Sequence, residues 1–278
     1  MHVLYSFPDV VGKPGIGVAA LHNVRVLAGE GVDVTLVCSS LGAGAEVEGA
    51  RAVATTLELA GRRIPHRVLG IDRAYRYHDR RAATVLERLA GDVDVVHTWP
   101  RAVLRTAAAA HRFGIPVVRE VSNTHTAHAY EVVAKEHARL GLPVPPGHSH
   151  AFDAGKLALE EAEYAAADLL LVPSPYSERT FLDRGFAPDR LAPHAYGFDP
   201  AEFYPDPERD VDGRPLTFLF AARCEPRKGL HHLLRAWHDS GLGAGGSRLV
   251  VLGEFVPGYR EVLAPLLDHP SIDRKSVV

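Results

Sequence analysis

Short apolar runs alternate with longer segments in which apolar residues recur three and four positions apart. The short runs have the length of strands, and their unbroken apolar character is typical of strands in a parallel sheet covered by helices. The predicted strands are residues 2–6, 32–38, 92–97, 116–120, 168–173, 216–222 and 248–252. Because each is followed by a predicted helix, the pattern predicts an α/β fold.

The strand at 216–222 leads into the segment with the strongest functional signal. Its apolar run predicts burial on both faces of a sheet. The polar loop that follows holds Arg223 and Lys228, and Gly229 lets the chain turn into a helix that starts near residue 230. Parallel sheets bind ligands at the carboxyl ends of their strands, and helix N-termini favour anions. The loop therefore predicts a phosphate or diphosphate site, with a solvated basic loop as the alternative.

The sequence Arg-Cys-Glu-Pro-Arg-Lys-Gly at 223–229 resembles the donor-binding loop of glycosyltransferase family 4. The resemblance implies the GT-B fold, with two Rossmann-like, doubly wound domains, and a retaining reaction. It implies that Arg223 and Lys228 hold the diphosphate of a UDP- or GDP-linked sugar, with no cofactor and no metal. Gly253 and Glu254 match the family's glycine loop near the nucleotide.

A second glycine-containing segment, Gly15-Ile-Gly17-Val18, opens a helix that is predicted to run to Glu30. A dinucleotide fingerprint would need a third glycine where Ala20 stands and a tight turn directly after the strand. A nicotinamide or flavin site is therefore disfavoured. The family resemblance instead places Gly15 beside the donor phosphates and the acceptor.

Polar residues at two predicted strand ends resemble the family's acceptor and sugar pocket. His97 ends the strand at 92–97 and matches the first such position. The second position falls on Ser122, and a histidine follows only at His125. Ser122, Asn123 and His125 therefore remain alternatives for the contact with the sugar.

Several histidines lie close together in the middle of the chain, at positions 125, 128, 137, 148 and 150. His125 and His128 have helical spacing near Glu131, but the sequence specifies no third ligand. Because the chain holds 16 histidines, such pairs arise by chance. Structural or acceptor-site roles are favoured, and no metal site is predicted.

The domain organisation follows from further matches and from one polar segment. Ser174, with Pro175 at the first helical position, predicts a capped helix, and the runs 166–178 and 191–205 resemble the segments that close the family's N-terminal domain. We predict an acceptor-side Rossmann-like domain at 1–205, a linker at 206–215 that is charged and broken by proline and glycine, and a partial nucleotide-sugar-binding domain at 216–272.

The end of the chain carries two expectations. The family's pair of glutamates near the donor ribose and sugar is expected beyond Val278, so the catalytic residues are unknown and the fragment is predicted to be inactive. Residues 273–278 are predicted to be non-native, because their codons can be written as a widely used sequencing-adapter sequence followed by a stop.

Composition limits the partners and the compartment. The net charge is −3, which gives no support to a nucleic-acid partner. Cys38 and Cys224 are the only cysteines and show no zinc spacing, and no apolar stretch reaches the length of a membrane span, so a cytoplasmic location is predicted. Residues 62–88 hold eight arginines, and peripheral contact of 62–90 with anionic lipid stands beside a solvated helix face as an interpretation.

The resemblance thus implies a retaining glycosyltransferase that moves a sugar from a nucleotide donor to an acceptor hydroxyl, here as a fragment. The acceptor remains open between a glycan, a lipid and a small molecule. Two alternatives remain: another GT-B enzyme, such as a sugar phosphorylase or synthase, and a non-catalytic remnant that binds a nucleotide or a sugar.

Overall fold

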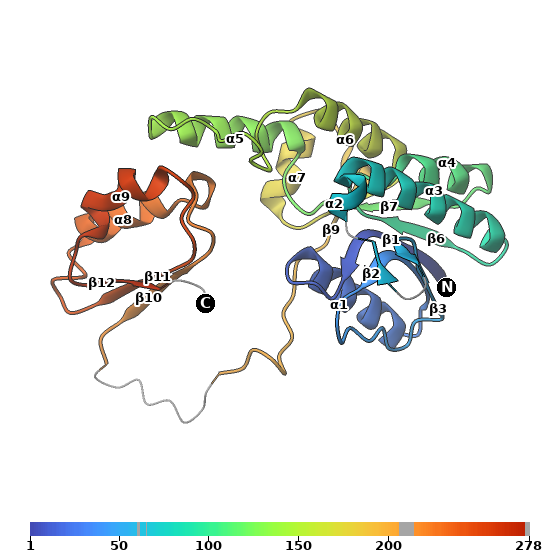
Figure 1. Cartoon of the computed structure of the whole chain (residues 1–278), viewed down its shortest axis with the longest axis horizontal. Coiled ribbons are helices and arrows are strands. Elements are labelled where there is room, and N and C mark those ends of the chain that lie inside the picture. The colour runs from blue at the N-terminus through green and yellow to red at the C-terminus, as the bar shows by residue number, and fades with distance from the viewer. Residues whose placement is uncertain (60–61, 65, 206–213, 276–278) are drawn as a thin grey trace. The chain divides into compact units, whose positions relative to one another are not determined.

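The computed structural model describes residues 1–59, 62–64, 66–205 and 214–275 (Figure 1). The chain divides into two compact units. The first comprises Met1–Thr126 and Asp153–Tyr196, and the second comprises Ala127–Phe152 and Gly197–Val278. Most of the predicted linker, at 206–213, and the end of the predicted non-native tail, at 276–278, lie outside the described residues.

The first unit is built on a parallel sheet with the strand order β3-β2-β1-β6-β7-β8-β9. Its strands are β1 (His2–Val11), β2 (Asp33–Leu41), β3 (Ala52–Thr55), β6 (Val95–Thr98), β7 (Val117–Glu120), β8 (Leu169–Val172) and β9 (Leu191–Pro193). β1 is longer than predicted and continues past Phe7 through a register shift in its pairing with β2. A small antiparallel pair, β4 (Glu58–Leu59) and β5 (Arg62–Arg63), follows β3.

Helices cover both faces of this sheet. Since successive residues of a strand point to opposite faces, one strand can pack against helices on both sides. Tyr5 and Phe7 of β1 pack in one core cluster with α1, whereas Leu4 packs in another with α3 and α4. The helices of the unit are α1 (Ile16–Gly29), α2 (His66–Leu69), α3 (Ile71–Leu89), α4 (Leu104–Arg112), α6 (Ala154–Ala166), α7 (Pro175–Leu182) and the 3-10 turn η1 (Pro188–Arg190). The unit is therefore a doubly wound, Rossmann-like domain, as predicted.

The second unit contains a smaller parallel sheet in the order β10-β11-β12 (Figure 1). Its described elements are α5 (Thr126–Arg139), β10 (Thr217–Ala221), the 3-10 turn η2 (Pro226–Lys228), α8 (Leu230–Ser240), β11 (Arg248–Leu252), α9 (Tyr259–Leu267) and β12 (Ile272–Lys275). Leu249 and Val251 of β11 form one core cluster with Leu234 of α8 and Leu263 of α9.

The expected burial of residues 216–222 on both faces is wrong. Within the described residues, β10 is an edge strand, paired only with β11. Phe218 packs against Trp237 of α8 with ring centroids 5.4 Å apart, but Leu219, which points to the opposite face, is 63% exposed. An apolar run therefore predicted the strand correctly, but it does not show whether both faces of the strand are covered.

Residues 127–152 belong to the second unit although they lie within the first 205 residues of the chain. Leu140 and Leu142, after α5, pack against the core cluster of α8, β11 and α9. The side chain of Leu142 also lies 3.4 Å from the position of a Cβ on Gly258. The smaller sheet is thus covered in part by a segment that is distant from it in sequence.

Candidate functional site

The loop after β10 carries the two cations that the sequence assigns to the donor. Arg223 is exposed beyond the end of the strand, and Lys228 is exposed at the end of η2. Neither forms an ion pair with a carboxylate among the residues that the structure describes. Gly229 has a left-handed φ of 75° and begins α8 at Leu230, where a helix start was predicted. Both cations are therefore available to a ligand at the carboxyl end of the strand.

Glu225 holds this loop in place through ion pairs with two other residues. It is buried, and its Oε1 accepts hydrogen bonds from Nε and Nη2 of Arg227 at 3.1 and 2.7 Å. Its Oε2 lies 3.2 Å from Nε2 of His148, which comes from the segment 127–152. Burial alone would raise the pKa of Glu225, but the charge of Arg227 and the hydrogen bond with His148 outweigh burial and lower it. Arg227 is thus engaged within the protein, in contrast to Arg223 and Lys228.

The loop after β11 runs beside the loop after β10. The N–H of Cys224 donates to the carbonyl oxygen of Glu254 at 2.8 Å, and Cys224 also forms a parallel bridge with Phe255. Gly253, at φ 151°, has no room for a side chain, because a Cβ there would lie 1.9 Å from the carbonyl oxygen of Ala222. The structure therefore brings Gly253 and Glu254 together with the segment that carries Arg223.

The glycines after β1 have different structural roles. Gly15 is the N-cap of α1 and has a φ of 94°, which disfavours other residues, and a Cβ on it would meet no atom within 4 Å. Gly17 packs so tightly that a Cβ would lie 2.3 Å from the carbonyl oxygen of Val10. The backbone around Gly15 is thus the part of this loop with space beside it.

The strand order places this glycine loop at a ligand-binding position of the first sheet. β1 lies between β2 and β6, and the chain progresses outward from it in both directions. Ligands of doubly wound sheets bind outside the carboxyl ends of the strands at such a switch point. His97, in β6, pairs in register with Tyr5 of β1, and their ring centroids are 4.5 Å apart. His97 in β6 and Gly15 in the loop that follows β1 therefore lie in the two strand-to-helix segments that meet at the switch point.

Glu120 joins two histidines at the carboxyl ends of the strands. It is 1% exposed, and its Oε2 lies 3.2 Å from Nε2 of His97, while its Oε1 lies 3.2 Å from Nδ1 of His194. The three residues come from β6, from β7 and from the segment after β9. This cluster holds the His97 imidazole in one orientation through its Nε2.

The cluster has perturbed ionisation. Burial alone would raise the pKa of Glu120, but hydrogen bonds from His194 and His97 outweigh burial and lower it. The hydrogen bond to Glu120 raises the pKa of His194. The favoured state near neutral pH is thus an ionised Glu120 bonded to imidazoles, of which His194 carries a proton more readily than an ordinary histidine.

The other residues predicted for the acceptor pocket have three different environments. Ser122 is exposed, and the side chain of Asn123 accepts a hydrogen bond from the N–H of Thr124. His125 is 2% exposed. Its ring centroid lies 5.1 Å from that of Tyr164 and 5.1 Å from that of Phe181, a distance typical of aromatic packing. The structure thus places His125 within an aromatic cluster, whereas Ser122 faces solvent.

Glu120, His194 and Glu225 were not predicted from the sequence as part of either site. Glu120 ends an apolar strand, and an acid in that position was the one available signal. His194 follows a strand of three residues, so its pairing with Glu120 depends on the alignment of β7, β8 and β9 rather than on any motif. Glu225 lies between Arg223 and Lys228 in the sequence, but nothing there indicates its partner His148, which is 77 residues away.

The family assignment follows from a comparison of the sequence with protein families. The model of the family described as Glycosyltransferase Family 4 matches residues 14–202, which include Gly15, His97 and Glu120. The chain belongs to glycosyltransferase family 4. A comparison with curated proteins gives no match.

Solved structures similar to this family 4 chain include several glycosyltransferases. The galactosyltransferase WaaB of the lipopolysaccharide outer core is 13% identical, with a TM-score of 0.56 over 100% of this chain and 68% of WaaB. Sucrose-phosphate synthase of Thermosynechococcus elongatus is 16% identical, with a TM-score of 0.63 over 100% of this chain and 70% of the synthase. HepE of Anabaena, in complex with UDP and glucose, is 16% identical, with a TM-score of 0.55 over 99% of this chain and 68% of HepE.

At these identities the similarity establishes the GT-B fold and not the reaction. A protein described as a UDP-N-acetylglucosamine 2-epimerase of Listeria monocytogenes is also among the matches, with a TM-score of 0.50, so the same architecture supports different chemistry on a nucleotide sugar. The family match over 14–202, and not the fold, is what favours a transferase.

The described helices include none that is long and apolar enough to cross a membrane. α3 is amphipathic, with Ala74, Ala82 and Leu86 buried and with Arg73 and Arg76 exposed. Contact of residues 62–90 with anionic lipid stays a prediction.

Proposed function

We propose that this chain carries the donor and acceptor sites of a retaining glycosyltransferase that moves a hexosyl group from a UDP- or GDP-linked donor to an acceptor hydroxyl. The observation that carries the proposal is the loop after β10, where Arg223 and Lys228 are exposed beside a second loop that Gly253 allows to approach closely. Two exposed cations at the carboxyl end of the strand, close to the start of α8, suit a diphosphate.

The chemistry assigned to the second unit is stabilisation of the leaving group. As the bond between the anomeric carbon and the diphosphate oxygen breaks, the bonding electrons and the negative charge move onto the diphosphate. Arg223 and Lys228 would stabilise that charge, and this stabilisation increases as the bond breaks. The acceptor oxygen would bond to the anomeric carbon on the face from which the diphosphate leaves, and its proton would pass to the departing diphosphate oxygen.

The chemistry assigned to the first unit is placement of the acceptor and the sugar. His97 lies at the switch point, and Glu120 holds its Nε2. The Nδ1 of His97 would then be the atom that faces a sugar or acceptor hydroxyl. Gly15, with open space beside its backbone, would let a substrate approach the start of α1.

Nucleotide binding and the configuration of a product test the proposal. Titration calorimetry with UDP and GDP should give saturable binding, whereas NAD and inorganic phosphate should bind much more weakly. We expect binding without turnover for residues 1–278, because this sequence contains no match to the glutamate pair that the family resemblance implies. Absence of nucleotide binding would contradict the donor site.

Turnover would separate the alternatives. If the chain releases UDP or GDP only when an acceptor hydroxyl is present, transfer is established, and the expected inactivity is wrong. A product with inverted anomeric configuration by NMR would refute the retaining reaction. A requirement for inorganic phosphate as the second substrate would instead identify a sugar phosphorylase.

A further inference from the structure

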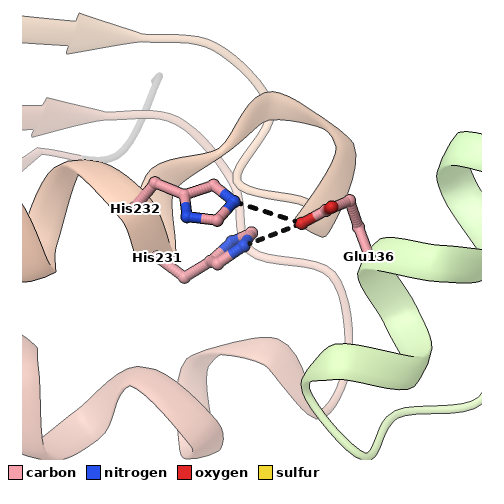
Figure 2. A group of neighbouring side chains, drawn as sticks. All are labelled: Glu136, His231 and His232. Atoms are coloured by element: carbon pink, nitrogen blue, oxygen red, sulfur yellow. Dashed lines mark hydrogen bonds and ion pairs between the residues drawn. The ribbon is translucent and has the colours of Figure 1, made fainter.

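Three potential metal ligands meet between α5 and α8 in the second unit (Figure 2). Glu136 projects from α5, and His231 and His232 project from the first turn of α8. The Oε2 atom of Glu136 lies 3.1 Å from Nε2 of His231 and 3.2 Å from Nε2 of His232. One ligand atom of each residue lies within 4.8 Å of those of the other two, and this is the one such group among the residues that the structure describes.

These separations suit ligands of a single ion. Zinc binds imidazole nitrogen and carboxylate oxygen at about 2.0–2.2 Å with tetrahedral geometry, which places two ligands of the same ion about 3.4 Å apart. The observed nitrogen–oxygen distances are close to that spacing. They are also hydrogen-bond distances, so the environment of the three side chains has to distinguish the two interpretations.

Neighbouring groups hold the ligands as they are held in metal sites. Nδ1 of His231 lies 2.8 Å from the hydroxyl oxygen of Tyr259, and Oε1 of Glu136 accepts a hydrogen bond from Nη1 of Arg139 at 2.6 Å. Ligating histidines commonly use their second nitrogen in this way, and ligating carboxylates are themselves hydrogen-bonded. The atoms that remain, Nε2 of His231 and Oε2 of Glu136, are the ones that face each other.

The binding of an ion here requires one tautomer of His231. Its proton would lie on Nδ1 and be donated to Tyr259, whose oxygen has two lone pairs and already accepts the backbone N–H of His231 at 3.0 Å. Nε2 would then present its lone pair to the ion. Because the His231 imidazole is neutral in this tautomer, an ion can bind to its Nε2 without release of a proton from the residue.

The three ligand side chains differ in how far they are buried. The side chains of His231 and Glu136 are 1% and 14% exposed, whereas that of His232 is 54% exposed. An ion could thus reach the site from the side of His232, where water would complete its coordination. The positive charge of Arg139 repels a cation bound nearby, and it also neutralises part of the charge of the Glu136 carboxylate. The site therefore suits an ion that binds imidazole and carboxylate strongly.

We propose that Glu136, His231 and His232 form a binding site for a divalent transition-metal ion of the zinc, cobalt or nickel type. Two imidazoles and one carboxylate favour such ions over magnesium and calcium, which prefer oxygen ligands. The ion would link α5 to the helix that follows the loop of Arg223 and Lys228, and it would thereby stabilise the second unit without taking part in the transfer of the sugar.

Metal titration of the whole chain tests this site. The protein is stripped with EDTA, dialysed and titrated with ZnCl2 by calorimetry and with CoCl2 by visible absorption. His232→Asn and Glu136→Gln are compared with the wild type, and His238→Asn is the matched control, because His238 is an exposed histidine of the same helix that hydrogen-bonds the carbonyl of Leu266.

One zinc ion per chain is expected, with an affinity that falls at least about tenfold in His232→Asn and Glu136→Gln and stays unchanged in His238→Asn. Zinc should also raise the melting temperature of the wild type with increasing concentration. If Glu136→Gln fails to fold, His232→Asn decides alone, since its side chain is exposed. Equal zinc affinity in the wild type and His232→Asn, or no saturable binding by the wild type, would overturn the proposal.

Discussion

A Cβ atom on Gly253 would lie 1.9 Å from the carbonyl oxygen of Ala222. The contact is with backbone, which cannot rotate away as a flexible side chain could. The loops after β10 and β11 can therefore lie side by side only because residue 253 has no side chain, and the hydrogen bond from Cys224 to Glu254 depends on the same approach.

We expect Gly253→Ala to lower the free energy of unfolding by about 1–3 kcal/mol, because the added methyl group forces the two loops apart. Urea denaturation measures this, and nucleotide affinity should fall with it. Gly29→Ala is the control, since a Cβ on Gly29 at the end of α1 meets no atom within 4 Å. A loss of stability in Gly29→Ala as large as that in Gly253→Ala would show that the contact with Ala222 is not the cause.

Lys228→Ala and Arg223→Ala should each weaken UDP or GDP binding by about tenfold or more. Each removes a charge-assisted hydrogen bond to the diphosphate, whose contribution is about 1.5–3 kcal/mol. Calorimetry should show the loss without a change in melting temperature, because both side chains are exposed. Arg260→Ala, which removes an exposed cation of α9 in the same unit, should leave affinity unchanged; unchanged affinity in Lys228→Ala would refute the assignment of the loop.

Glu120→Gln should lower the pKa of His194 toward the ordinary histidine value. The hydrogen bond to the Glu120 carboxylate is the largest cause of the raised pKa of His194, and the amide keeps an acceptor atom but carries no charge. NMR titration of the imidazole protons measures the change. If the His194 pKa is the same in both proteins, the pairing at 3.2 Å does not persist in solution.

The same pair predicts a window of pH for its contribution to stability. The raised pKa of His194 contributes stability that is complete below the unfolded histidine pKa of about 6.5 and is lost as pH rises through the folded value. The lowered pKa of Glu120 contributes stability that is complete above about pH 4.3 and is lost as pH falls through its folded value. The melting-temperature difference between the wild type and His194→Gln should therefore be largest between about pH 4.5 and 6.5.

Glu163→Ala should lower the free energy of unfolding by about 3–5 kcal/mol, because it leaves the buried Arg119 without its nearest carboxylate. Nη2 of Arg119 donates to Oε2 of Glu163 at 3.0 Å, and each side chain is 1% exposed. Replacement of both residues by methionine should restore much of the loss, since it removes both charges. Denaturant unfolding of Glu163→Ala and of the double methionine variant measures this recovery. A double variant that is no more stable than Glu163→Ala would contradict it.

The local structure of this chain could be predicted well from its sequence. Ser174 caps α7 by accepting the N–H of Ser177 at 3.1 Å, with Pro175 at the first helical position, as expected. Gly15 precedes α1 as expected. Such features depend on residues that are adjacent in sequence, so the residue types alone determine them.

The features that could not be predicted depend on partners distant in the chain. The sequence does not indicate that residues 127–152 pack with α8 and α9 rather than with the first sheet. In the same way, nothing near Glu120 in the sequence indicates His194, which is 74 residues away. The exposure of Leu219 depends on which elements cover the sheet, and an apolar strand looks the same in either case.

The chain passes between the two units three times, after Thr126, after Phe152 and after Tyr196. The second unit is therefore not a cassette that can be exchanged at one fusion point. A chimaera that joins its residues from 197 onward to the whole preceding segment of another enzyme would pair α8 with a foreign counterpart of α5, and Glu225 would lose His148. Exchange of donor specificity between such enzymes therefore requires that residues 127–152 be transplanted together with the C-terminal segment.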